Sequence, residues 1–87
     1  DVNLMKAGRG IVHSERSGSE DRKTTRTLAG IQSWIALPQN MEEDPPVFAH
    51  TEKTDLPLLD DGGVSVRLIM GEMLGGKSPV KQFSDTI

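Results

Sequence analysis

The sequence contains no cysteine among its 87 residues. This absence excludes disulfide frameworks, thiolate zinc sites and cysteine nucleophiles, and it is consistent with a reducing compartment. No run approaches the roughly 20 apolar residues of a membrane-spanning helix, and residues 1–10 (DVNLMKAGRG) lack the apolar centre of a signal peptide. The sequence therefore predicts a cytoplasmic protein.

Large aromatic side chains are scarce, since the chain has only Trp34, Phe48 and Phe83. A short chain buries a modest fraction of its surface, so such a core leaves only a few kcal/mol of net stability. We therefore expect partner chains or further segments to complete the fold. Basic residues do not predominate either: 10 Lys and Arg stand against 13 Asp and Glu. Without a basic stripe or interleaved aromatics, a nucleic acid is not the predicted ligand.

The apolar residues come in short runs bounded by Gly, Pro and Asp, and helical spacing is hard to find. This pattern is typical of short strands joined by turns, and it predicts an all-β chain. The expected strands are Val2–Met5, Ile11–Glu15, Gly30–Leu37, Val47–His50, Val64–Met70 and the start of another at Val80–Phe83. The fifth alternates most clearly, and Gly62 and Gly63 before it accept positive φ.

Two polar segments separate these runs. Residues 17–27 (SGSEDRKTTRT) contain no apolar residue, which predicts an exposed loop whose charges are solvated. Residues 38–46 (PQNMEEDPP) are acidic and proline-rich, so their backbone cannot supply a central-strand ladder.

The clearest chemical pattern is AGRGIVHSER, residues 7–16. Alternate side chains of a strand share a face, so His13 and Glu15 would project to the same side. An imidazole and a carboxylate so placed suit iron or another first-row divalent metal. Catalytic metal centres usually have three or more protein ligands, however. Spacing alone therefore favours the competing interpretation, a surface ion pair that contributes about 0–1 kcal/mol.

Other chemical signals are weaker. His50 has the same i, i+2 relation to Glu52, but it follows two prolines at the rim of the acidic loop, which favours a solvated side chain. Asp60-Asp61 and the acidic residues 42–44 lack the spaced oxygen ligands and the glycine of a calcium loop. The sequence has no phosphate loop, nucleophile elbow or dinucleotide fingerprint.

Three segments, in their order and spacing, resemble the pirin family of bicupin proteins. They are MKAGRGIVHSE (Met5–Glu15), GIQSWIALP (Gly30–Pro38) and VRLIMGEMLGGKSP (Val66–Pro79). The resemblance covers nearly all of the chain apart from residues 17–27. It implies a cupin-type (jelly-roll) β-sandwich present as an incomplete half-barrel. Residues 1–87 would form one partial cupin domain, roughly the middle third of the family pattern, from the end of the first barrel into the link toward a second.

The same resemblance implies a metal site. His13 and Glu15 would be two of four ligands to a single metal, typically iron, in the first barrel. The other two family ligands are histidines of an earlier strand, which no segment here matches. Glu15 would also act catalytically by taking a proton from a substrate hydroxyl.

Three functions follow from the resemblance. The first is a metal-dependent dioxygenase of the quercetin 2,3-dioxygenase type, with a flavonol as substrate. The second is a metal-dependent co-regulator that binds another protein through Arg9, Arg16 and the basic residues Arg22, Lys23 and Arg26. The third is a non-catalytic structural relic. In each case the unpaired strand edges of a half-barrel predict a homo-oligomer.

Overall fold

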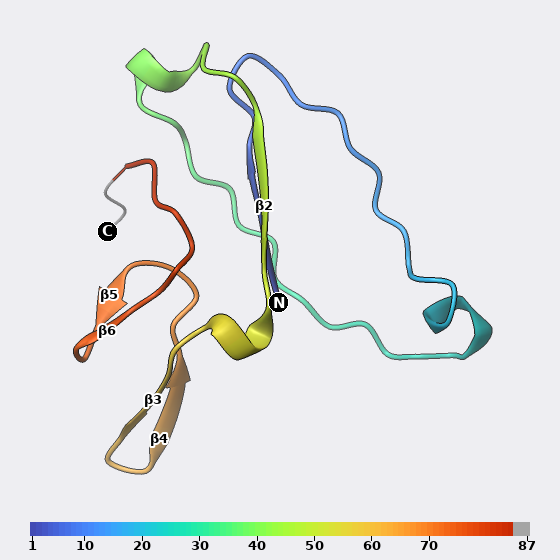
Figure 1. Cartoon of the computed structure of the whole chain (residues 1–87), viewed down its shortest axis with the longest axis vertical. Helices are drawn as coiled ribbons and strands as arrows, with labels where there is room; N and C mark the ends of the chain where they lie inside the picture. Colours follow the sequence, from blue (N-terminus) through green and yellow to red (C-terminus); the bar gives the residue numbers. More distant parts are fainter. Residues whose placement is uncertain (85–87) are drawn as a thin grey trace.

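The computed structural model describes residues 1–84, which form three separate antiparallel two-stranded sheets (Figure 1). The pairs are β1 (Val2–Lys6) with β2 (Val47–Thr51), β3 (Leu58–Asp61) with β4 (Val64–Arg67), and β5 (Glu72–Met73) with β6 (Gly76–Lys77). The chain also has three single turns of 3₁₀ helix. Two of them, η1 (Asp21–Lys23) and η2 (Gln39–Met41), lie between β1 and β2, and η3 (Lys53–Asp55) lies between β2 and β3. No α-helix occurs within these residues, so the predicted all-β class is confirmed. No helix among them has the length and apolarity needed to cross a membrane.

The β1–β2 sheet joins two segments that are far apart in the sequence. Val2 lies opposite Thr51 and Lys6 opposite Val47. The chain therefore leaves the sheet after β1 and returns only at β2, and residues 7–46 form a long excursion between the two strands (Figure 1). The ends of this excursion are held together, because the Arg9 N–H donates to the Asp44 carbonyl at 3.0 Å.

The β3–β4 hairpin turns at Gly62 and Gly63, whose φ angles of 55° and 86° confirm the predicted turn. The β3 strand was not predicted, because its two leucines stand between Pro57 and an acidic pair and make a very short apolar run. The β4 strand ends at Arg67, three residues before the predicted end. Beyond it the chain turns at Gly71, whose φ is 85°.

The apolar core is small and lies in the C-terminal half of the described chain. Its buried side chains are Leu56, Leu68 and Val80, with exposed fractions of 4%, 8% and 6%. Ser78 is also buried, and its hydroxyl donates to the Ile69 carbonyl at 2.7 Å. This polar contact ties the segment after β6 to the segment after β4.

Three predicted strands are wrong. Ile11–Glu15, Gly30–Leu37 and Val80–Phe83 have no strand structure. A strand needs a neighbour to satisfy its backbone donors and acceptors, and within residues 1–84 β1 and β2 pair only with each other. The first two segments therefore run as irregular chain, and Val12, Ile31 and Trp34 are 99%, 93% and 88% exposed.

Candidate metal centre

His13 and Glu15, the predicted metal ligands, lie in the first part of the segment between β1 and β2 (residues 7–46), where no strand forms. His13 Nε2 is 3.8 Å from Glu15 Oε1, and the two side chains are 45% and 78% exposed. Two donors each about 2.1 Å from one ion are no more than about 4.2 Å apart. The spacing therefore fits one shared ion, and an imidazole nitrogen with a carboxylate oxygen suits a first-row divalent metal. Within residues 1–84 no third His, Asp or Glu joins this pair.

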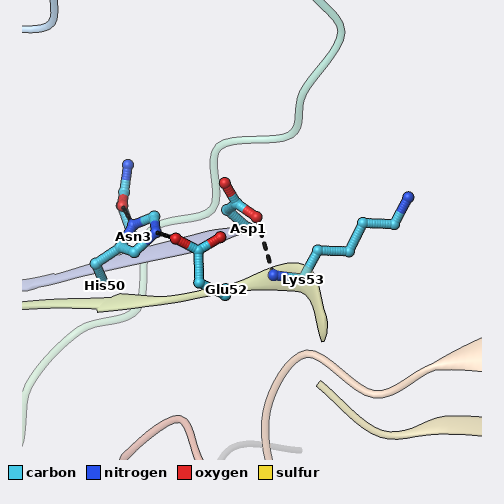
Figure 2. A network of polar contacts seen from close by, with 5 residues as sticks. All are labelled: Asp1, Asn3, His50, Glu52 and Lys53. Atoms are coloured by element: carbon cyan, nitrogen blue, oxygen red, sulfur yellow. Dashed lines mark hydrogen bonds and ion pairs between the residues drawn. The ribbon is translucent and has the colours of Figure 1, made fainter. Parts of the chain in front are cut away.

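A second group of donors lies at the end of the β1–β2 sheet where β1 begins and β2 ends (Figure 2). Asp1, His50 and Glu52 each offer one ligand atom, and these atoms lie within 4.8 Å of one another. His50 Nε2 is 3.2 Å from Glu52 Oε1, and His50 Nδ1 is 2.6 Å from Asn3 Oδ1. The Lys53 N–H donates to Asp1 Oδ1 at 2.9 Å, which orients the Asp1 carboxylate.

Sequence reasoning missed this second group. It favoured a solvated His50, and the side chain is indeed 42% exposed, but both of its ring nitrogens also have protein partners. The His50–Glu52 spacing was visible in the sequence, but the contribution of Asp1 and Asn3 depends on strand register. Asn3 lies opposite His50 only because β1 pairs antiparallel with β2.

An open hollow of about 1070 Å³ adjoins His50, between the end of β2 and the β5–β6 hairpin. On its lining, Lys77 Nζ donates to Glu72 Oε1 at 2.7 Å. This hydrogen bond, reinforced by the attraction between the charges, lowers the pKa of Glu72 and raises the pKa of Lys77. Both groups are therefore charged at neutral pH.

Two of the basic residues considered for protein binding, Lys23 and Arg26, form ion pairs inside their own loop. Lys23 Nζ lies 2.6 Å from Glu20 Oε1, and Arg26 lies 2.8 Å from Asp21. These exposed pairs leave little net positive charge in residues 17–27. The loop is exposed throughout, as predicted.

Together these features describe an all-β chain with groups of side chains that could hold a metal ion. Comparison with known proteins identifies its family. The family model described as Pirin matches residues 1–35, which include His13 and Glu15. A "Pirin-like protein" of Caulobacter vibrioides is 45% identical over 97% of this chain and 29% of that protein. "Pirin" of Rattus norvegicus is 33% identical over 100% of this chain and 28% of that protein.

A third relative, from Pseudomonas aeruginosa, bears the name "Putative quercetin 2,3-dioxygenase"; it is 37% identical over 95% of this chain and 24% of that protein. No solved structure matches the chain. The chain belongs to the pirin family, whose fold is of the cupin type, and the resemblance found in the sequence is confirmed. It spans less than a third of the length of these curated relatives.

Proposed function

We propose that this chain contributes half of the metal site of a cupin dioxygenase that acts on flavonols such as quercetin. The observation that carries the proposal is the 3.8 Å separation of His13 Nε2 and Glu15 Oε1 within the family-matched residues. The Pseudomonas relative named for this activity supports the substrate class. On this proposal residues 1–87 are one partial cupin domain of a cytoplasmic protein.

His13 and Glu15 share one role, metal binding, and Glu15 has a second role in proton transfer. His13 and Glu15 would hold iron, or another first-row divalent ion, which when bound would act as a Lewis acid toward a substrate oxygen. Glu15 is the more exposed of the two. Its second carboxylate oxygen is the group we assign to accept the proton of the substrate hydroxyl. Since the described residues offer this pair no third donor, the remaining ligands would come from elsewhere in a complete protein or from a partner chain.

Metal content tests the proposal directly. The chain would be purified with iron supplied, and metal per chain would be measured by elemental analysis beside His13→Ala and Glu15→Ala. Glu43→Gln is the matched control, because it removes an exposed acidic residue that belongs to neither group of metal donors. We expect near-stoichiometric iron that both His13→Ala and Glu15→Ala abolish and the control retains, with loss of quercetin absorbance under oxygen only where iron is bound. Iron content unchanged by both substitutions contradicts the proposal.

We also propose a homo-oligomer formed through residues 11–16 and 28–37. Apolar side chains in these segments are almost fully in solvent: Val12, Leu28, Ile31 and Trp34 are 99%, 97%, 93% and 88% exposed. Backbone groups without strand partners favour pairing with another chain. Sedimentation should therefore give a species larger than a monomer, and the Trp34 emission should shift to the blue as concentration rises. A monomer with unshifted emission at high concentration contradicts this assignment.

A further inference from the structure

The imidazole of His50 has a hydrogen-bond acceptor at each ring nitrogen (Figure 2). Nδ1 lies 2.6 Å from Asn3 Oδ1, and Nε2 lies 3.2 Å from Glu52 Oε1. With the Asn3 amide in this orientation its oxygen can only accept, so Nδ1 carries the proton. Nε2, which faces the Glu52 carboxylate, is then the ring nitrogen available to an ion.

The Nε2 atom of His50 and the Glu52 carboxylate are two members of a donor group at the end of the sheet where β1 begins and β2 ends. Asp1 brings a further carboxylate to the same place, with one donor atom of each of the three residues within 4.8 Å of the others. Three converging donors, one imidazole and two carboxylates, match the needs of a divalent ion. Two donors on one ion are no more than about 4.2 Å apart, so each pair of donor atoms in this group must come within that distance. Small rotations of these exposed side chains are enough.

The contacts around this group resemble the support that metal-bound residues usually have. A histidine ligand commonly donates its other ring N–H to an oxygen, which fixes the tautomer and the ring orientation. Asn3 supplies that oxygen from the neighbouring strand. The Lys53 N–H occupies Oδ1 of Asp1, so Oδ2 is the oxygen that can turn to an ion.

We propose that Asp1, His50 and Glu52 form a second metal site, separate from the His13–Glu15 pair, that binds Zn²⁺ or a chemically similar divalent ion. One imidazole and two carboxylates form a donor set that zinc accepts, with water in the remaining position. The site links the start of β1 to the end of β2, two segments that the chain connects only through its long excursion. Because the donors converge only when the strands are paired, the ion stabilises the folded chain.

Zinc titration of the intact chain by calorimetry tests this site, with three variants: Asp1→Asn, His50→Ala and Glu52→Gln. We expect each variant to weaken zinc binding at this site at least tenfold. Asn3→Ala should weaken it about tenfold by freeing the ring, although Asn3 is not itself a ligand. Glu43→Gln is the matched control, since it removes an exposed acidic residue elsewhere and should change nothing.

His13→Ala separates this site from the proposed dioxygenase centre. Zinc binding that persists in His13→Ala and disappears in His50→Ala supports the second site, whatever the iron content of the chain. A second measurement is the unfolding temperature, which saturating zinc should raise in the wild type and in His13→Ala but not in His50→Ala. Two results overturn the proposal: zinc binding unaffected by His50→Ala, or a His50 ring that NMR shows doubly protonated at neutral pH with zinc present.

Discussion

The ammonium nitrogen of Lys6 lies 3.0 Å from Asp44 Oδ2, and only 8% of the Lys6 side chain is exposed. The pair joins the end of β1 to the segment that leads into β2. The same ammonium also lies 4.8 Å from the centre of the Phe83 ring. One buried charge therefore holds together the two ends of the long excursion and a residue near the end of the described chain.

This arrangement predicts that Asp44→Asn destabilises the fold. Removing the carboxylate leaves a buried ammonium without its counter-charge, which should cost about 1–3 kcal/mol. Replacing both partners, as in Lys6→Met with Asp44→Asn, should cost less than Asp44→Asn alone. The measurement is the urea midpoint followed by circular dichroism.

Lys23→Gln is the control for that experiment, because it breaks a shorter ion pair, of 2.6 Å, whose side chains are 66% and 80% exposed. It should change stability by no more than about 0.5 kcal/mol. Equal losses of stability in Lys23→Gln and Asp44→Asn would show that the burial of Lys6 does not add to the stabilising effect of its ion pair.

A methyl group at Gly8 should be more harmful than one at Gly62. Both glycines have φ near the left-handed region, at 52° and 55°, so alanine carries a similar conformational cost of about 1–2 kcal/mol at each. At Gly8 the added Cβ would also lie 2.0 Å from the Asp44 carbonyl oxygen, whereas at Gly62 nothing lies within 4 Å. Gly8→Ala must therefore separate the two ends of the excursion, and Gly62→Ala need not.

Urea midpoints of Gly8→Ala and Gly62→Ala make this comparison. Gly8→Ala should lose clearly more stability, and the amide of Arg9, which donates to the same carbonyl, should exchange faster. If both variants lose the same amount, the close approach of Gly8 and Asp44 contributes nothing to the fold.

The sequence predicted β1, β2 and β4 as strands, but only the hairpin turn before β4 has a local cause; the pairing of β1 with β2 does not. The alternation of Val64 to Arg67 and the glycines before it are enough to place a hairpin arm and its turn. Residues 11–15 and 30–37 were also predicted as strands, yet a strand also needs a neighbour, which the pattern cannot supply. The candidate sites divide in the same way. His13 and Glu15 are close in sequence, so their spacing predicted the pair, whereas Asp1 reaches His50 only through strand register.

The Glu72–Lys77 pair predicts a stability plateau between acid and alkaline limits. The folded-state pKa of Glu72 is lowered, so its contribution is present above the ordinary pKa of a glutamate and is lost as pH falls through the lowered value. The folded-state pKa of Lys77 is raised, so its contribution is present below the ordinary pKa of a lysine and is lost as pH rises through the raised value. Both side chains are well exposed, so salt should weaken the effect.

NMR titration of the Glu72 carboxyl carbon measures this coupling. Lys77→Gln should move the midpoint of Glu72 up toward its ordinary value, whereas Lys81→Gln, which removes a lysine outside the pair, should leave it in place. An unchanged midpoint in Lys77→Gln would mean that the two side chains do not hold their 2.7 Å contact in solution.

The small core predicts that stability depends on the C-terminal half of the described chain. Leu56→Ala removes a side chain that is only 4% exposed and should cost about 2–4 kcal/mol. Leu58→Ala is the matched control, because Leu58 is 55% exposed and its truncation should cost well under half as much. Urea midpoints provide the comparison.

Hydrogen exchange adds a local test: the Leu68 amide, bonded to the Pro57 carbonyl at 2.9 Å, should lose protection in Leu56→Ala. Amides of residues 11–18 should exchange fast in both variants, since that segment has no strand to lose. Equal midpoints in the two variants would mean that Leu56 lies outside the cooperative core.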